Sequence, residues 1–491
     1  MNKKVLIKEN IKQIINNRKQ KIKKLKDINI NPYPAKYRLE KNNADIISDY
    51  INLKKETIIN NVMIKAAGRI IRRRNMGKSI FLDIKDAYAE IQIYINVNII
   101  GKEQYKLFKN MIDISDIIGI EGTPFKTKTN ELSIMVKKWR ILSKAVKPLP
   151  EKWHGLKDIE VRYRQRYLDF IVNGNVKKNF LKRSKIISAI RNKLENLGFI
   201  EVETPILQYI PGGATAKPFI THHNSLNMDL YLRISPELFL KRIIIGNVDK
   251  IFEIGKNFRN EGIDRNHNPE FTMLELYQAY TDYNDMMIIA EELINIAAKV
   301  VNPNAKLIFK KEKLFDLIEK YTNLNLISFL ESDRMIDVVK NLNLTLPKNA
   351  TNKKILNQIF DEKVVPNLKS PTFVIDYPAI YSPLAKTKHD NPKIAERFEI
   401  YINNMEIGNA YSELNDPYLQ KNKFIQQRKE KYVQKDNISY DKDYISALEY
   451  GLPPTGGLGI GIDRLIMVLT GAKSIRDVII FPTMKLNDRK L

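Results

Sequence analysis

Residues 249–280 read DKIFEIGKNFRNEGIDRNHNPEFTMLELYQAY, and their pattern predicts two strands joined by a charged loop. Apolar and polar residues alternate on both sides of this loop, which contains Gly262. Arg259 ends the first strand and Phe271 begins the second. This pair suits a nucleotide, because a guanidinium binds phosphate and a ring face stacks on a base. His267 lies in the loop, either as a further phosphate contact or as an ordinary loop residue.

A second pair of strands is predicted from ERFEIYINNMEIGNAYSELNDP at 396–417. Asn403 and Asn404 fit a two-residue turn of a kind that asparagine favours. This pairing makes Glu399 and Glu406 diagonal neighbours on one face, ~7–8 Å apart at the backbone. Two carboxylates at that spacing suit a hard cation such as Mg²⁺, although most glutamate pairs are simply solvated. From the residues alone both interpretations stay open.

The second strand of this hairpin is expected to be irregular. Asn409, Tyr411 and Glu413 share one face, but their parity is opposite to that of Glu406. For all four side chains to line one pocket, the strand needs a bulge. Gly408 permits the backbone geometry that a bulge requires, so we place the irregularity there.

A glycine-rich strand follows near the end of the chain, where residues 457–465 read GLGIGIDRL. The segment lacks the GK[ST] ending of a P-loop and does not fit the GxGxxG pattern. Its glycines alternate along the strand, which lets a ligand approach the backbone closely. Arg464 enters the helix that follows, in a place suited to a phosphate contact.

Composition narrows the functional classes. The chain has 491 residues and a formal net charge of 82 − 56 = +26. Such an excess favours a nucleic-acid partner, but an AT-rich genome that favours lysine codons would produce it too. The absence of cysteine excludes disulfides, cysteine-ligated zinc, iron–sulfur clusters and a thiol nucleophile. No apolar run is long enough to span a membrane and no signal peptide is recognisable, so we expect a cytoplasmic protein.

The N-terminal part of the chain reads as a basic helix followed by a small β-barrel. Residues 1–30 predict one or two turns of helix, which either packs against the fold or leans on nucleic acid. Residues 62–143 contain five β-rich segments with a helical stretch between the third and fourth, as in an OB-fold barrel. Basic and aromatic side chains on one face suit single-stranded nucleic acid. The residues expected on this exposed face are Arg69, Arg72, Arg73, Arg74, Phe81, Gln92 and Tyr94.

The predicted fold class is α+β. We expect an N-terminal helix and lead-in over 1–60, the OB-fold barrel over 61–145, a connector over 146–175 and a catalytic domain over 176–491. Within the last of these, residues at about 285–370 read as a helical insertion.

Several long motifs, in order along the chain, resemble those of the class II aminoacyl-tRNA synthetases. The segments at 258–277, 396–417 and 457–465 resemble motifs 2 and 3 of that class, and LGFIEVETPIL at 197–207 resembles motif 1. Three others resemble the lysine-specific members, the lysyl-tRNA synthetases of the bacterial type. These are PGGATAKPF at 211–219, RISPELFLKR at 233–242 and PPTGGLGIGIDRL at 453–465.

This resemblance implies a catalytic antiparallel sheet flanked by helices and an OB-fold barrel that binds the anticodon. It also implies a homodimer whose interface involves motif 1 with Pro205. The implied activity is the ATP-dependent ligation of L-lysine to tRNA(Lys) through a lysyl-adenylate, with Mg²⁺ as cofactor. No protein nucleophile takes part, since catalysis rests on positioning and on charge neutralisation by arginine and Mg²⁺.

The resemblance implies a role for each ATP-site residue. Arg259 is expected on the α-phosphate and the lysine carboxylate, and Arg464 on the γ-phosphate together with His267. Phe271 is expected to stack on adenine, with Glu261 near the adenine amino group. Glu399 and Glu406 are expected to hold Mg²⁺, Glu406 being an ATP-site residue as well, and Phe81 and Gln92 to contact the anticodon.

The implied lysine site is acidic. Its expected members are Gly213, Glu237 and Glu275 around the α-amino group, Asn409 at the carboxylate, and Glu413 and Tyr277 at the side-chain ammonium. Three glutamates fit a substrate with two ammonium groups and repel an aspartate side chain. The competing hypotheses are an aspartyl or asparaginyl enzyme of the same class and a non-catalytic RNA-binding protein on a synthetase scaffold.

Four positions depart from the pattern of the resembled family. Asn130 stands where a turn glycine is expected, and asparagine tolerates the left-handed backbone that such a turn requires. Lys217, Lys256 and Lys423 stand where arginine is usual. Each keeps the charge but loses the bidentate fork of a guanidinium.

Overall fold

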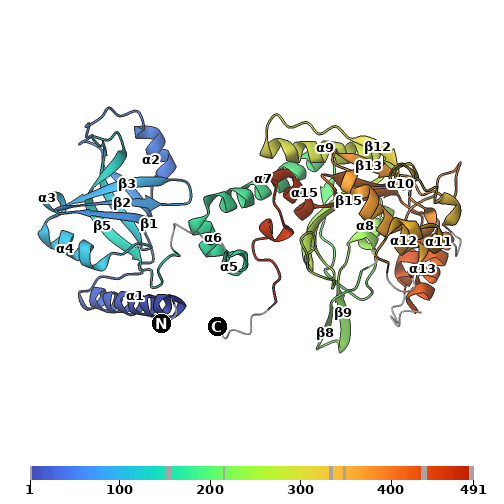
Figure 1. Ribbon diagram of the computed structural model, residues 1–491, viewed down its shortest axis with the longest axis horizontal. Coiled ribbons are helices and arrows are strands. Elements are labelled where there is room, and N and C mark those ends of the chain that lie inside the picture. The colour runs from blue at the N-terminus through green and yellow to red at the C-terminus, as the bar shows by residue number, and fades with distance from the viewer. Residues whose placement is uncertain are drawn as a thin grey trace. The chain divides into compact units, whose positions relative to one another are not determined.

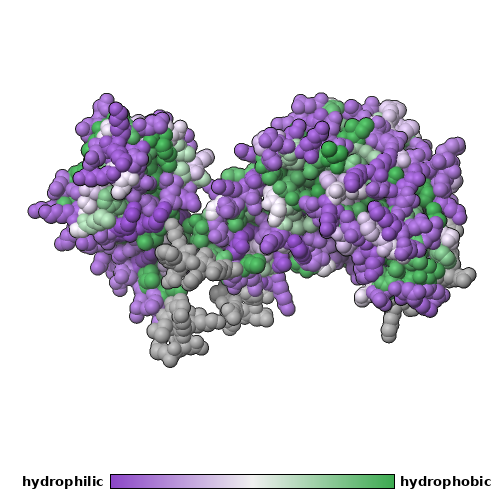
Figure 2. Space-filling model, turned by 45° about the horizontal axis from the view of Figure 1, so that its top comes forward, coloured by the Kyte–Doolittle hydropathy of each residue, from purple (hydrophilic) through white to green (hydrophobic). Residues whose placement is uncertain are grey.

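The computed structural model describes residues 3–150, 156, 158–213, 216–330, 335–346, 350–432 and 440–485. The chain divides into two compact units, Met1–Gly155 and Leu156–Leu491 (Figure 1). Hydrophilic residues cover most of the face of each unit that Figure 2 shows, with hydrophobic residues in smaller areas between them. Among the described residues, no helix is long and apolar enough to cross a membrane.

The first unit is a closed five-stranded barrel with the strand order β1-β2-β3-β5-β4. A buried aliphatic core fills it, and α4 (Lys102–Met111) lies in sequence between β3 and β4, so the predicted OB-fold is confirmed. The remaining elements are α2 (Asn43–Tyr50), α3 (Val97–Ile100), β1 (Ile64–Met76), β2 (Ser79–Lys85), β3 (Glu90–Asn96), β4 (Ile117–Lys126) and β5 (Leu132–Ser143). In the turn before β5, Asn130 has φ +67°, the left-handed backbone expected of it.

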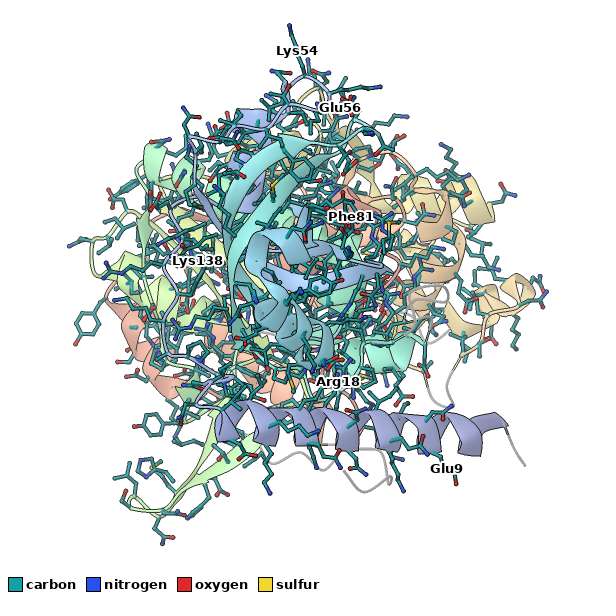
Figure 3. All side chains as sticks on the ribbon, turned by 90° about the vertical axis from the view of Figure 1, so that its left-hand side faces the viewer. Glu9, Arg18, Lys54, Glu56, Phe81 and Lys138 are labelled. Carbon is teal, nitrogen blue, oxygen red and sulfur yellow. The ribbon has the colours of Figure 1, made fainter. Side chains whose placement is uncertain are left out.

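The N-terminal helix is longer than predicted. Instead of one or two turns, α1 runs over 25 residues, Lys3–Asp27, before the prolines at 32 and 34. Arg18 donates hydrogen bonds to the carbonyls of Ala145, 3.0 Å away, and Ile114, 2.9 Å away. Figure 3 shows α1 beside the barrel, with Arg18 pointing toward the barrel and Glu9 pointing away. The helix is therefore fixed to the barrel by its C-terminal half.

The second unit is built on an eight-stranded sheet with the order β12-β13-β14-β15-β16-β11-β10-β6. Its central pairs are antiparallel, as predicted, while the outer pairs β12–β13 and β10–β6 are parallel. The strands are β6 (Ile200–Glu201), β10 (Lys250–Phe258), β11 (Glu270–Ala279), β12 (Lys310–Lys313), β13 (Thr372–Ile375), β14 (Arg397–Ile402), β15 (Met405–Ser412) and β16 (Thr455–Gly461). A small separate sheet holds β7 (Leu207–Gln208), β8 (Ile220–His223) and β9 (Met228–Leu232).

Helices cover both faces of the large sheet. On one face α7 (Gly174–Asn196), α9 (Tyr283–Val301) and α15 (Ile462–Thr470) enclose the main hydrophobic core. On the other face α8 (Glu237–Ile245) and α14 (Lys442–Glu449) form a smaller apolar cluster. The end of α7 is where the sequence predicts it, because Gly198 takes up left-handed backbone at φ +84°. The face that carries α8 also carries the candidate site.

The helical stretch predicted over 285–370 divides into two parts. Helix α9 packs in the main core of the unit. Beyond β12, a separate apolar cluster is formed by α10 (Leu314–Thr322), α11 (Met335–Val338), α12 (Asn352–Ile359) and the π-helical turn Phe360–Val364, with short 3₁₀ turns between and after them. The other helices of this unit are α5 (Ile159–Arg164), α6 (Arg166–Val172) and α13 (Pro417–Tyr432).

The hairpin of β14 and β15 turns at Asn403 and Asn404, with φ +50° and +64°, as predicted. The ladder is irregular next to Gly408: Ile400 pairs with Gly408 and Tyr401 with Glu406, which leaves one extra residue between them. The predicted bulge is therefore present. The extra residue is Ile407, while Gly408 stays paired with Ile400. Glycine is needed at position 408 because a side chain there would collide with the backbone of β16.

Candidate functional site

The floor of the candidate site is one row of residues across the sheet. The register aligns Glu253 with Glu275, Glu275 with Gly459, Gly459 with Asn409, and Asn409 with Glu399. All five residues share one face because cross-strand partners point to the same side of a sheet. The bulge restores this alignment, since Asn409 would otherwise face the opposite side from Glu406.

The glycines of β16 make room for functional side chains of neighbouring strands. A Cβ on Gly457 would overlap Oε1 of Glu413 and come within 2.6 Å of the Tyr277 ring. A Cβ on Gly459 would lie 3.3 Å from Met273 and 3.4 Å from the Asn409 side chain. We expected the missing side chains to admit a ligand to the backbone; the space at Gly457 is instead filled by two of the predicted lysine-site residues.

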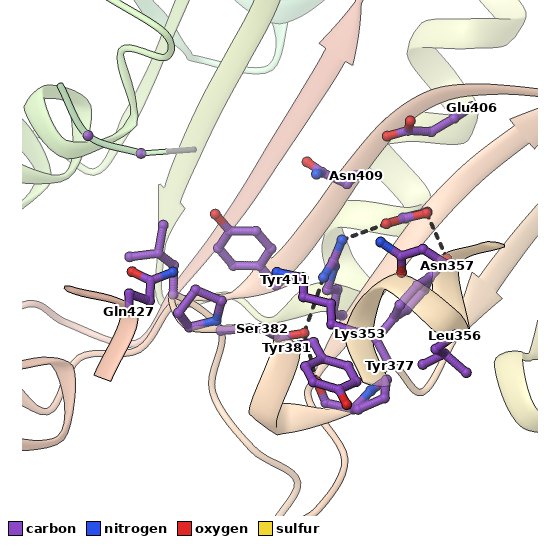
Figure 4. A pocket seen from close by; sticks show the side chains of 18 of the residues that line it. Lys353, Leu356, Asn357, Tyr377, Tyr381, Ser382, Glu406, Asn409, Tyr411 and Gln427 are labelled. Carbon is purple, nitrogen blue, oxygen red and sulfur yellow. Dashed lines mark hydrogen bonds and ion pairs between the residues drawn. The ribbon is translucent and has the colours of Figure 1, made fainter. Parts of the chain in front are cut away.

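A cavity of about 480 Å³ opens above this floor. Five predicted site residues line it: Gly213, Arg259, Glu399, Glu406 and Asn409. Figure 4 shows Glu406, Asn409 and Tyr411 on the strand side of the cavity and Leu356 and Asn357 on helix α12 nearby. The wall thus combines the sheet with the inserted helical cluster.

The other predicted lysine-site residues are buried behind that wall. Glu237, Glu275, Tyr277 and Glu413 are each exposed by 5% or less. Tyr411 joins the two layers: it lines the cavity, and its hydroxyl donates to Oε1 of Glu237 over 2.7 Å. Gly213 abuts Glu237 as well, since a Cβ on Gly213 would lie 3.1 Å from the Glu237 side chain. The acidic residues therefore adjoin the cavity without lining it in this structure.

The buried carboxylates have perturbed ionisation. Burial, reinforced by the charge of Glu237, raises the pKa of Glu275 to about 7. Hydrogen bonds from Ser235, 2.8 Å, and Tyr277, 3.2 Å, work in the opposite direction because they stabilise the charged form. Burial also raises the pKa of Glu413, against the influence of the ammonium of Lys241. A proton must therefore leave before these carboxyl groups can bind positive charge, and a bound cation would in turn favour their ionised form.

A second cavity, of about 230 Å³, adjoins the first. The six predicted ATP-site residues line it: Arg259, Glu261, His267, Phe271, Glu406 and Arg464. Arg259, Glu406 and Asn409 line both cavities and so mark their junction.

Two arginines of this second cavity, Arg259 and Arg464, have different contacts. The guanidinium of Arg259 lies over the Phe271 ring, 5.1 Å from its centroid, and its Nε is buried without a partner among the described residues. Arg464 donates to Oε2 of Glu406 over 3.1 Å and meets Nε2 of His267 at 2.8 Å. A pair of arginines beside an aromatic face is suited to a nucleoside polyphosphate.

The predicted metal residues, Glu399 and Glu406, lie on neighbouring strands and face the first cavity. Glu399 accepts bonds from Arg397 (2.5 Å) and from the hydroxyls of Tyr377 and Tyr401 (2.8 Å each), and both Glu399 and Glu406 line the first cavity. In the part of the chain that the structure describes, no group of three or more histidine or acidic side chains is arranged to hold a metal. Two carboxylates alone still fit Mg²⁺, because this ion completes its coordination with water and substrate phosphates.

In the barrel, the predicted exposed face is only partly exposed. Gln92 is 8% exposed, and its carbonyl accepts a hydrogen bond from Ser133 over 3.0 Å, so the expectation of an exposed Gln92 is wrong. Phe81, labelled in Figure 3, packs against Tyr94 with ring centroids 4.8 Å apart and keeps part of its surface open. Arg69 and Arg72 are engaged locally, by the Ser115 carbonyl and by two acidic side chains.

Sequence reasoning missed several side chains that complete the site. Arg397 and Tyr377 fix Glu399, Ser235 bonds to Glu275, and Lys241 contacts both Glu237 and Glu413. The spacing of Glu237 and Lys241, four residues apart on a helix, was a readable signal for an ion pair. Arg397 lies two residues before Glu399 on the same strand, whereas Tyr377 and Ser235 come from more distant parts of the chain and left no local pattern.

Two family profiles match the chain. The profile described as tRNA synthetases class II (D, K and N) matches residues 158–485, and the one described as OB-fold nucleic acid binding domain matches residues 64–142. Both agree with the two units of the structure.

Curated relatives match over almost the whole chain. The chain is 47% identical to a lysine–tRNA ligase from Pelotomaculum thermopropionicum, over 97% of this chain and 96% of that protein. It is 50% identical to a lysine–tRNA ligase from Wigglesworthia glossinidia brevipalpis, over 95% of this chain and 97% of that protein. A third relative of the same name, from Clostridium tetani, is 47% identical over 96% of each chain.

Proposed function

Because the chain belongs to the lysine–tRNA ligases of the class II tRNA synthetase family, we propose that it joins L-lysine to tRNA(Lys) in an ATP-dependent reaction. The lysine carboxylate attacks the α-phosphate of ATP, which forms lysyl-adenylate and releases pyrophosphate. The terminal adenosine hydroxyl of the tRNA then takes the lysyl group and AMP leaves. Lysine-dependent ATP–pyrophosphate exchange, with aspartate and asparagine as the alternatives, tests the proposal.

One observation carries the choice of lysine. Three buried glutamates, Glu237, Glu275 and Glu413, lie together beside the first cavity. That cavity adjoins the second one, which is assigned to the nucleotide. An acidic pocket favours the two ammonium groups of lysine and disfavours an aspartate side chain, whose charge it would repel. In our assignment Glu237, Glu275 and Gly213 surround the α-ammonium, and Glu413 with Tyr277 receives the side-chain ammonium.

The remaining assignments follow from the second cavity. Arg259, at the junction of the two cavities, holds the α-phosphate and the lysine carboxylate, with Asn409 beside the carboxylate. Phe271 stacks on adenine near Glu261, and Arg464 with His267 holds the γ-phosphate. These groups act by position and charge, because the lysine carboxylate is itself the nucleophile and receives the adenylyl group.

The fit of Glu399 and Glu406 supports a Mg²⁺ site at the border of the two cavities. The ion supplies charge neutralisation of the ATP phosphates when bound. The carboxylate of Glu399 is held in place for this role by hydrogen bonds from Arg397, Tyr377 and Tyr401.

The raised pKa of Glu275 makes lysine binding dependent on pH. Below about pH 7 the carboxyl group is mainly protonated, and a proton must leave before it can bind an ammonium. The KM for lysine should therefore fall as the pH rises from 5.5 to 7, by up to about tenfold per pH unit. In Glu275→Gln the KM should be higher and this step should vanish; a wild-type KM independent of pH would contradict the assignment.

Phe81 gives a separate prediction for the barrel. Phe81→Ala should reduce tRNA charging by about tenfold, because a base–aromatic stack of 1–3 kcal/mol is lost, while lysine-dependent exchange stays unchanged. Tyr88→Ala, which removes an aromatic ring that is 73% exposed beyond the end of β2, is the matched control and should leave both rates alone. Equal loss of charging and exchange in Phe81→Ala would refute a dedicated anticodon role.

We also propose a homodimer acting in the cytoplasm, where tRNA is charged for translation. Large apolar side chains around motif 1 are exposed, namely Ile200, Ile206, Leu207, Tyr209 and Ile220. A patch of this kind is typical of a protein interface. Ile206→Glu combined with Leu207→Glu should shift sedimentation from dimer to monomer, whereas Ile288→Glu, on the exposed side of α9, should not; a monomeric wild type would overturn the proposal.

A further inference from the structure

A fully buried lysine sits among the glutamates of the proposed lysine site. Lys241 lies on α8, and its side chain has no solvent exposure. Its ammonium is 2.6 Å from Oε1 of Glu237 and forms a second ion pair with Oε2 of Glu413. It also faces two aromatic rings, 5.9 Å from the centroid of Tyr277 and 5.5 Å from that of Tyr411. Burial of a charge is so unfavourable that an ammonium stays in such a place only when it is paired.

The carboxylate of Glu413 is not saturated by this contact. Oε1 of Glu413 has no hydrogen-bond partner among the described residues, and it points to the space that Gly457 leaves open. Tyr411, which lines the cavity, also bonds to Glu237. Lys241 therefore leaves an oxygen of Glu413 for a substrate ammonium to bind.

The ionic charges of the pocket and the substrate balance only when Lys241 is counted. Three ionised glutamates, Glu237, Glu275 and Glu413, and one ammonium give a net charge of −2. The two ammonium groups of the substrate carry +2, and its carboxylate is matched by Arg259. Without the fixed ammonium, the buried pocket would carry −3 and would take up a proton at neutral pH, because adjacent buried carboxylates resist joint ionisation.

We propose that Lys241 is a positioning residue for substrate recognition: its ion pairs with Glu237 and Glu413 hold both carboxylates in place and offset one of the three negative charges that the glutamates can present to a diammonium substrate. This inference rests on the proposed function. In it, a permanent cation of the protein offsets one glutamate charge, while the proton on Glu275 still responds to pH. Without that cation, one glutamate of the pocket would become protonated. The pocket could then bind a substrate with a neutral group in place of the side-chain ammonium.

The groups that face Lys241 come from every element packed around it. Glu237 lies on the same helix, Tyr277 is on β11, Tyr411 and Glu413 are on or just after β15, and Tyr444 is on α14. Burial raises the pKa of Tyr277, Tyr411 and Tyr444, so these phenols stay neutral through the physiological range. The carboxylates of Glu237 and Glu413 are therefore the charged groups that lose a partner when Lys241 is replaced.

The test compares Lys241→Met with the wild type by ATP–pyrophosphate exchange between pH 6 and 8.5. At pH 7 the KM for lysine should be about tenfold or more above that of the wild type. As the pH rises, the KM should stop falling at a pH at least about one unit above the pH where the wild-type KM stops falling. The KM for ATP should change by less than about twofold, since Lys241 lines neither cavity. The preference for lysine over 6-hydroxynorleucine, which carries a neutral hydroxyl in place of the side-chain ammonium, should fall by about tenfold.

Arg242→Met is the matched control. It removes the next cation on the same helix, which pairs with Asp441 at 2.7 Å instead of with the glutamate cluster. Its pH profile and its preference for lysine should match those of the wild type. Lys241→Gln keeps a hydrogen-bond donor but removes the charge, and it should behave as Lys241→Met. This comparison distinguishes the effect of the charge from the effect of the hydrogen bond.

A wild-type profile and preference in Lys241→Met would overturn the inference. If neither Lys241 variant folds, the wild type itself provides the test. Calorimetry of lysine binding at pH 8, in two buffers of different ionisation enthalpy, measures the number of protons released. The inference expects release of well under one proton, and release of one proton or more would overturn it. If instead the wild type shows no lysine-dependent exchange, the proposed function fails, and that outcome is distinct from the others.

Discussion

Arg259→Gln is expected to lower lysine-dependent ATP–pyrophosphate exchange by about three orders of magnitude. Arg259 lines both cavities, and its guanidinium lies 5.1 Å from the centroid of the Phe271 ring with a buried Nε that has no partner among the described residues. A buried cation at the junction is placed where negative charge develops as the lysine carboxylate attacks the α-phosphate. Glutamine keeps hydrogen-bond donors but removes the charge and the bidentate fork.

The loss should appear mainly in kcat, because the charge is needed more in the transition state than in the ground state. Arg191→Gln is the control, since Arg191 forms a surface ion pair with Glu201 at 2.7 Å and such pairs contribute little. Activity within about tenfold of the wild type in Arg259→Gln would mean that the α-phosphate lies elsewhere.

Gly457→Ala is expected to raise the KM for lysine by about a hundredfold or more while the protein still binds ATP. The added Cβ would overlap Oε1 of Glu413 and lie 2.6 Å from the Tyr277 ring, which are the two groups assigned to the side-chain ammonium. Both are buried, so neither has free space into which to move. The carboxylate must therefore turn away from the substrate or the strand must shift.

Nucleotide binding should survive this change because Gly457 lines neither cavity, and the retention of a fluorescent ATP analogue would measure it. Gly174→Ala is the control, since a Cβ at that position at the start of α7 meets no atom within 4 Å. A wild-type KM for lysine in Gly457→Ala would contradict the placement of the ammonium between Glu413 and Tyr277.

The sequence predicts the parts of this fold that local chemistry controls. Asparagines at 403 and 404 specify the turn, the change of parity between Glu406 and Asn409 requires a bulge, and Gly198 ends a helix. In each case the residue type and its spacing permit few alternatives. The length of α1 was underestimated because its lysines and isoleucines repeat too irregularly to mark one continuous face.

The contacts between distant segments could not be predicted in this way. Lys241 meets Glu413 across 172 positions of sequence, and Tyr411 meets Glu237 across 174. The burial of Gln92 depends likewise on Ser133 in another strand of the barrel. Nothing local in the chain encodes these pairings, which arise when the register of a whole sheet is set.

Amino-acid-dependent ATP–pyrophosphate exchange on the intact protein tests the central claim most directly. The assay supplies ATP, Mg²⁺, labelled pyrophosphate and one amino acid at a time, and it requires no tRNA. Exchange should be strong with L-lysine and at background with L-aspartate and L-asparagine, because the proposed pocket of Glu237, Glu275 and Glu413 suits ammonium groups. Exchange with aspartate or asparagine and none with lysine would contradict the account.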